Sequence, residues 1–322
     1  MTRIKGRIQY LETHDWMNIS FFLFLSLVSL IFVTQNMERF LLPVVNIFII
    51  FFIVIIVSNY ESKNYIDESA PPLARFIRYW YPVFTILFCF KEVYVIMISH
   101  GDKLHDGVLA QIDRAIFGGN PTQMLHQFAH PYLTEFFQIV YGIFYLMPVI
   151  FASELYLWHR YSEFKYATFV IMFGFYLSFI GYLLVPAVGP RFVLHEFAAT
   201  DAELPGVFLT QTIRDFINLG ESIPKGEMNA ILVAQRDAFP SGHTIVILLI
   251  TYLSRKFRSG SFYFYLPYSL LMIFSTVYLR YHYVIDIIGA VPFVLATVFV
   301  SNMLYRNKLN SIVVPKAQGK KF

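Results

Sequence analysis

The chain has 322 residues, of which 57% are hydrophobic, 19% aromatic and only 14% charged. Soluble domains carry about a quarter charged residues, so this composition excludes an ordinary soluble domain. The net charge of +4 is small and does not indicate a nucleic-acid partner. We therefore expect an integral membrane protein.

The apolar residues form continuous blocks, most of them about 17 to 22 residues long, which is the length of a helix that crosses a bilayer. Only helices or closed barrels satisfy every backbone group in lipid, and barrel strands would show an alternating pattern. The predicted fold is an all-α polytopic membrane helix bundle of about eight spans. In chain order these are Met17–Val33, Leu41–Val57, Trp80–Ile98, Leu133–Leu157, Ala167–Ala187, His243–Leu253, Phe262–Leu279 and Ile287–Leu304.

Basic residues are divided unevenly between the two sides of this predicted bundle. With eight spans both termini lie on one side, and that side holds 16 lysines and arginines against eight on the other. Cytoplasmic loops carry an excess of such residues. We therefore expect both termini in the cytoplasm and the loops after the third, fifth and seventh spans on the extracytoplasmic face.

The chain shows no internal repeat and no low-complexity linker, which favours one membrane domain. Residues 1–78 are predicted to form an N-terminal cytoplasmic segment and two accessory spans. Residues 79–305 are predicted to form a catalytic transmembrane core with long outer loops at 100–132 and 188–242. Residues 306–322 are a basic cytoplasmic tail.

Three polar stretches lie at span ends on the predicted extracytoplasmic side. They are LVPAVGPRF after the fifth span, DAFPSGHTIVILLITY at the start of the sixth, and STVYLRYHYVIDIIGA between the seventh and eighth. In the first of them, Gly189 and Pro190 break the helix and present Arg191 at the membrane boundary. Ionisable residues beside a span commonly mark a functional site, so we expect the three stretches to converge.

Two of these stretches carry a histidine suited to nucleophilic or acid–base chemistry. On a helix, His282 and Asp286 share a face, and the carboxylate can accept the Nδ1–H of the imidazole. This leaves the Nε2 lone pair of His282 free as a nucleophile. His243 can give a proton to a leaving oxygen.

The same stretches offer groups for binding an anion. Backbone N–H groups at the helix start from Ser241 through Gly242 to His243 form an anion site. Arg191 and Arg280 add fixed positive charge with a geometry suited to phosphate oxygens. Together with the histidines, these groups predict phosphoryl transfer through a phosphohistidine, without a metal or another cofactor.

PSGH and HYVID resemble the second and third signature motifs of the type 2 phosphatidic acid phosphatase superfamily, and GPR resembles the arginine end of its first motif. The eight-span layout and the forms PAVGPR and STVYLRYHYVID are similar to its inositol-phosphorylceramide synthase-like branch. The resemblance covers roughly the fifth to eighth spans. The roles that it implies are phosphate binding by Arg191, a phosphate cradle at Ser241 and Gly242, acid catalysis by His243, and attack by His282 with Asp286 as its partner.

The chain departs from the superfamily pattern at two positions. Leu184 stands where the first motif usually begins with lysine, and Thr276 stands where the third motif usually has arginine. We infer that Arg280 replaces the missing guanidinium.

Several other polar residues are weaker candidates. Lys91 and Glu92 interrupt the third span and are candidate substrate-pocket residues, although adjacent residues point about 100° apart on a helix. Asp113 and Arg114 either contact a lipid head group or form surface charges. HQFAH has metal-capable spacing but no third ligand, so no metal site is predicted.

The leading hypothesis is an integral membrane phosphotransferase or phosphohydrolase that acts on a phospholipid or lipid-phosphate ester. The branch resemblance favours transfer of a phospho-inositol-like head group to the hydroxyl of a ceramide- or diacylglycerol-type acceptor. One alternative is a lipid phosphate or polyprenyl diphosphate phosphohydrolase. A second is a non-catalytic membrane transporter or scaffold on the same fold. The oligomeric state does not follow from the sequence.

Overall fold

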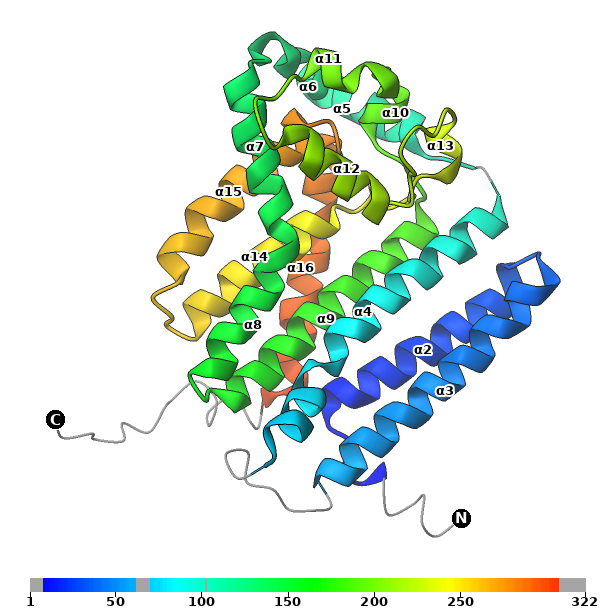
Figure 1. The fold of residues 1–322 in the computed structure, drawn as a ribbon, viewed down its shortest axis with the longest axis vertical. Coiled ribbons are helices and arrows are strands. Elements are labelled where there is room, and N and C mark those ends of the chain that lie inside the picture. The colour runs from blue at the N-terminus through cyan, green and yellow to red at the C-terminus, as the bar shows by residue number, and fades with distance from the viewer. Residues whose placement is uncertain (1–7, 62–69, 102, 307–322) are drawn as a thin grey trace, which may run out of the picture. The chain divides into compact units, whose positions relative to one another are not determined.

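The computed structural model describes residues 8–61, 70–101 and 103–306 (Figure 1). The predicted basic tail from residue 307 onward lies outside these residues. Within the described part every regular element is a helix, as the apolar blocks predict. The helices group into two compact units, and α9 (Tyr161–Leu184) and α16 (Val284–Leu304) contribute to both.

The first unit contains three long helices that pack against one another: α2 (Thr13–Phe32), α3 (Asn36–Glu61) and α4 (Pro72–His100). Their apolar composition makes them suitable for a bilayer. Several of their buried polar side chains form hydrogen bonds with one another. Arg78 donates to both carboxylate oxygens of Asp15, at 3.1 and 3.0 Å. Asn18 donates to the Thr85 hydroxyl at 2.9 Å. These contacts hold α2 to α4 at buried positions.

The second unit contains four long helical segments and a group of short helices. The long segments are α7 (Pro131–Ile143) with α8 (Met147–Leu157), α14 (Gly242–Lys256), α15 (Phe262–Tyr278) and most of α16. Helix α15 packs against α7 and α14. The short helices are α5 (Asp106–Phe117), α6 (Pro121–Leu125), η1 (His126–Phe128), η2 (Phe144–Leu146), α10 (Pro190–Val193), η3 (Phe197–Ala199), α11 (Thr200–Glu203), α12 (Thr210–Gly220) and α13 (Ala230–Val233).

The predicted long outer loops are therefore largely helical. Figure 1 shows α5, α6 and α10 to α13 at one end of the long helices of this unit. Within the group, α5 packs on α10, while α12 packs on the long helix α7. The Glu135 carboxylate of α7 accepts backbone hydrogen bonds from residues 207–210, at 2.6 to 3.2 Å, and one from the Thr210 hydroxyl at 2.6 Å. This carboxylate anchors the chain that leads into α12.

All eight predicted spans correspond to helices, and six candidates in the described residues are long and apolar enough to cross a membrane. The chain is an integral multi-pass membrane protein. Two predicted spans correspond to helices that are not among these six candidates: α14, with 15 residues, and α15, with 17. At 1.5 Å per residue, α14 is shorter than the roughly 30 Å hydrocarbon layer. The fifth span also ends earlier than predicted, at Leu184 rather than Ala187, because Pro186 disfavours a helical conformation at the preceding residue.

Candidate active site

Three segments meet in the second unit, and they belong to the three stretches that the sequence marks as polar. Ala187 and Asp237 form a parallel bridge between the first and second segments. Further backbone hydrogen bonds tie all three together: Ala238 N to Ala187 O (2.9 Å), Arg191 N to Arg280 O (3.0 Å) and Ser241 N to Asp286 O (3.1 Å). Convergence of stretches that lie far apart in the chain therefore rests on direct main-chain bonding.

Gly189 and Asp106 shape the turn that leads to Arg191. Gly189 has a φ of +95°, and a Cβ atom at this position would lie 2.6 Å from the Tyr281 carbonyl oxygen. Only glycine combines this conformation with so close an approach. The Asp106 carboxylate accepts the backbone N–H groups of Val188 (3.1 Å) and Gly189 (2.8 Å), and the Tyr283 hydroxyl donates to it at 3.1 Å. Asp106 thus joins the first segment to the third.

The two histidines that the sequence singles out lie side by side. His243 Nδ1 is 3.1 Å from His282 Nε2. His282 is buried, and its Nδ1 lies 2.9 Å from the Ala238 carbonyl oxygen and 3.3 Å from Asp286 Oδ2. His282 precedes α16, which begins at Val284, so the turn before the helix rather than a shared helical face brings it to Asp286.

The hydrogen-bond partners define a consistent set of tautomers. A carbonyl oxygen only accepts, so His282 carries its proton on Nδ1 and keeps the lone pair on Nε2. That lone pair accepts the Nδ1–H of His243. The Tyr141 hydroxyl lies 3.0 Å from Nε2 of His243 and donates to it. The arrangement provides a nucleophilic nitrogen with a proton donor in contact.

Burial decides the charge of His282. Desolvation lowers the pKa of His282 to about 4, because the imidazolium loses hydration, and the nearby Asp237 carboxylate opposes this shift. His282 is therefore neutral near pH 7. For Asp237 itself, desolvation and the neighbouring Glu221 carboxylate raise the pKa to about 7.

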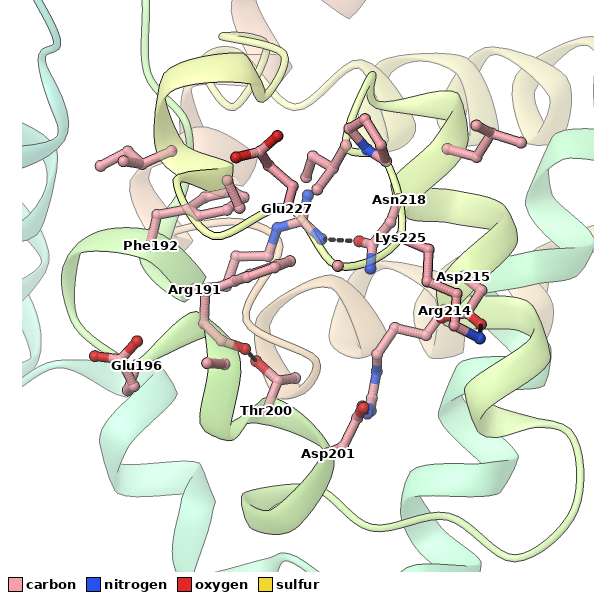
Figure 2. Close-up of a pocket in the computed structure, with 18 of the residues that line it drawn as sticks. Arg191, Phe192, Glu196, Thr200, Asp201, Arg214, Asp215, Asn218, Lys225 and Glu227 are labelled. Carbon is pink, nitrogen blue, oxygen red and sulfur yellow. Dashed lines mark hydrogen bonds and ion pairs between the residues drawn. The ribbon is translucent and has the colours of Figure 1, made fainter.

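Arg191 is buried beside the histidines with its guanidinium fully engaged. One nitrogen donates to Asn218 Oδ1 at 3.0 Å (Figure 2), and another forms an ion pair with Glu221. The guanidinium carbon also lies 4.7 Å from the ring centre of Tyr281 and 4.6 Å from that of Phe192. The cation is thus in contact with two aromatic rings, and α12 and the residue that follows it orient the guanidinium through Asn218 and Glu221.

Two cavities meet at Arg191. A small one, of about 10 Å³, lies beside the histidines, with Tyr141, Arg191, Glu221, Asp237, His243, Tyr281 and His282 among its lining residues. Its volume corresponds to about one water molecule. A larger one, of about 830 Å³, lies among the outer helices and is also lined by Arg191 and Tyr281. Figure 2 shows Asp201, Arg214, Asp215 and Lys225 around it.

The predicted cradle at the start of α14 has a more structural role in this conformation. Ser241 is its N-cap, and the Ser241 hydroxyl accepts the Thr244 N–H at 3.2 Å. The Ser241 N–H is bonded to Asp286 O. At Gly242 the Tyr182 hydroxyl occupies the position that a Cβ atom would take. Ser241 therefore caps α14 and bonds its first turn to Asp286, and Gly242 allows the close approach of Tyr182.

Arg280 does not line either cavity. Its guanidinium forms an ion pair with Glu203 and lies 3.0 Å from His126 Nδ1. Its backbone carbonyl, rather than its side chain, contacts Arg191. Thr276 is buried, and its hydroxyl donates to Ile273 O at 2.7 Å. Leu184 is exposed.

None of the four candidate pocket residues lines either cavity. Lys91 and Glu92 belong to the first unit, where Asn46 donates to Glu92 Oε1 at 2.7 Å. Asp113 accepts the N–H groups of Val284 and Ile285, both at 2.8 Å, and so caps the start of α16. Arg114 is exposed on α5. Among the described residues, no group of three or more His, Cys, Asp or Glu side chains could hold a metal ion.

Sequence reasoning missed several residues of this region. Tyr141 lies inside an apolar span, and Glu221 and Asn218 lie in an outer segment without a motif. Asp106 was missed as well. The signal that could have drawn attention to Asp237 is its place in the stretch that carries PSGH.

The family described as the PAP2 superfamily has a sequence model that matches residues 107–300, well over half of the chain. The matched range contains both histidines, Arg191 and Asp286, and it does not include Lys91 or Glu92. No curated protein and no solved structure matches the chain.

Proposed function

The chain belongs to the PAP2 superfamily, and on this premise we propose that it is a membrane lipid phosphotransferase that works through a phosphohistidine at His282. Superfamily membership supports a lipid phosphatase or phosphotransferase kind of function. The observation that carries the proposal is the contact of His243 Nδ1 with His282 Nε2, 3.1 Å apart, in a cavity that Arg191 also lines. These three groups provide a nucleophile, an acid and a phosphate ligand.

The proposed reaction has two steps. In the first, Nε2 of His282 attacks phosphorus, an N–P bond forms, and the P–O bond to the leaving alcohol breaks. The Nδ1–H of His243 is hydrogen-bonded to this nitrogen in the present conformation, so that bond breaks as the phosphate enters, which frees the Nε2 lone pair, and the proton then passes to the leaving oxygen. In the second, the acceptor hydroxyl returns a proton to His243 and attacks phosphorus, which releases His282.

Arg191 and Asp286 stabilise the charges of this reaction. Arg191 neutralises phosphate oxygens in a buried site, where a fixed cation acts more strongly than in water. Asp286 Oδ2 lies 3.3 Å from His282 Nδ1 and favours the positive charge that develops on the phosphorylated ring. The Ala238 carbonyl oxygen keeps the tautomer in place.

Head-group transfer is our preferred outcome over hydrolysis. The branch-like forms PAVGPR and STVYLRYHYVID support it, and so does the burial of both Arg191 and His282, which limits their contact with bulk water. A phosphohistidine survives long enough to meet a lipid hydroxyl only if water is largely excluded. We therefore propose transfer of a phospho-inositol-like group to a ceramide- or diacylglycerol-type acceptor, at the extracytoplasmic face, with both termini in the cytoplasm.

The test uses the purified full chain in mixed micelles. Phosphatidylinositol is supplied with and without ceramide or diacylglycerol, and phosphatidic acid and a polyprenyl diphosphate are supplied separately. A new acceptor-dependent phospholipid supports transfer, whereas acceptor-independent release of inorganic phosphate indicates a phosphohydrolase. His282→Ala should abolish either activity, and His130→Ala, at an exposed histidine of the same unit, is the control. Unchanged activity in His282→Ala would contradict the proposal, and a wild-type protein that turns over none of these lipids would favour a transporter or scaffold.

A further inference from the structure

The small cavity beside the histidines is lined by more carboxylates than arginine and lysine side chains. Among the described residues that line it, Arg191 is the one arginine or lysine, whereas two carboxylates, Glu221 and Asp237, line it as well. The remaining polar side chains are the two histidines and two tyrosines. Arg280, which could have added a cation, is paired with Glu203 outside this lining.

The main chain of both acidic residues is fixed by backbone contacts. Glu221 follows α12, where its N–H donates to Ile217 O at 2.9 Å and its carbonyl oxygen accepts from Gln235 N at 3.2 Å. Asp237 pairs with Ala187 in the bridge between the first and second segments. If a phosphate displaces the Glu221 side chain from Arg191, the fixed main chain still keeps the carboxylate within side-chain reach of the site. Its negative charge is a persistent feature of the cavity.

We infer that Glu221 and Asp237 determine substrate specificity, by making the site select singly charged phosphodiesters over doubly charged phosphomonoesters. The inference rests on the proposed function and names the class of lipid that the same site accepts. Coulomb repulsion scales with the charge of the ligand, so each carboxylate penalises a dianion twice as strongly as a monoanion. The single guanidinium, that of Arg191, offsets one negative charge. The second negative charge of a phosphomonoester is then left without a cationic partner.

The most direct test measures binding rather than turnover. Methyl phosphate and dimethyl phosphate are small soluble probes. At pH 8 methyl phosphate is mainly a dianion, because the pKa of its second ionisation is about 6. Dimethyl phosphate is a monoanion at this pH. Ligand-observed NMR titration of the full-length protein in detergent gives the ratio of their dissociation constants. Glu221→Gln keeps the side-chain shape and an acceptor for Arg191 but removes the charge. Asp237→Asn does the same for the second carboxylate and serves as an independent variant if Glu221→Gln fails to fold.

Wild-type protein should bind dimethyl phosphate more tightly than methyl phosphate. Each variant should shift the ratio of dissociation constants about tenfold toward methyl phosphate, because one repelling charge is removed at close range. Glu227→Gln is the matched control, since Glu227 lines the larger cavity and not the small one, and it should leave the ratio unchanged. An unchanged ratio in the folded Glu221 or Asp237 variants would overturn the inference, and so would a wild type that binds neither probe.

Turnover separates this inference from the proposed function. If the ratio shifts while no lipid is turned over, the charge selection stands and the catalytic proposal fails. If phosphatidylinositol is turned over and Glu221→Gln leaves the relative kcat/KM for phosphatidylinositol and phosphatidic acid unchanged, the catalytic proposal stands and the selection is refuted.

Discussion

Replacing Asp286 by asparagine separates two roles that a carboxylate can play beside a catalytic histidine. The substitution removes the charge and keeps an oxygen for the Tyr283 N–H, which donates to Asp286 Oδ2 at 2.8 Å. His282 Nδ1 has a nearer acceptor in the Ala238 carbonyl oxygen, at 2.9 Å against 3.3 Å for Asp286. The Nδ1–H tautomer should therefore survive in Asp286→Asn.

The size of the effect follows from this geometry. A hydrogen bond to a charged group contributes about 1.5–3 kcal/mol, and about 1.36 kcal/mol corresponds to a tenfold change in rate. Loss of the charge should therefore slow formation of the phosphohistidine about 10- to 150-fold. Where a carboxylate alone sets the tautomer, as in a serine protease triad, the corresponding substitution costs about 10⁴-fold.

A single-turnover measurement with radiolabelled lipid phosphate reports this step directly. Thermal unfolding of the same preparation shows whether Asp286→Asn is folded. A loss near 10⁴-fold in a folded variant would mean that Ala238 does not hold the tautomer. An unchanged rate would mean that Asp286 takes no part in stabilising the charge on His282.

Three further predictions address other parts of the site. Gly189→Ala should lower the stability by about 1–3 kcal/mol, because the backbone is at φ +95° and the added methyl meets the Tyr281 carbonyl; thermal unfolding measures this. Glu135→Gln turns an amide NH2 toward several N–H donors, so limited proteolysis should cut residues 200–230 faster, and equal cutting rates would contradict the anchoring role. Because burial lowers the pKa of His282 to about 4, the acid limb of kcat/KM that reports His282 should lie near pH 4, where protonation removes the lone pair. An acid limb near pH 6.5 that persists in Asp237→Asn would contradict this assignment.

The apolar blocks were sufficient to predict the helices, because length and composition alone determine which segments suit a bilayer. The convergence of the PSGH and HYVID stretches with GPR also followed from their equal depth at span ends. The shared face of His282 and Asp286 was a less accurate prediction, since His282 lies in the turn before α16. The proximity is the same, but the backbone that creates it is different.

Roles that depend on distant contacts could not be predicted in this way. Asp106 and Glu135 accept backbone N–H groups from segments more than 70 residues away, and a sequence carries no local signal for such partners. Glu221 pairs with Arg191 only because α12 folds over it. For Arg280 a role was predicted that the structure does not show. Its position in the motif indicated a phosphate ligand, whereas its guanidinium is paired with Glu203.

The central claim is that His282 becomes covalently phosphorylated. A rapid alkaline quench of the full-length protein with lipid labelled at phosphorus, followed by peptide mapping, tests it most directly, since phosphohistidine survives base and is lost in acid. We predict label on the peptide that contains His282, absent in His282→Ala and present in His130→Ala. Turnover without label on His282, or label that persists in His282→Ala, would contradict the account.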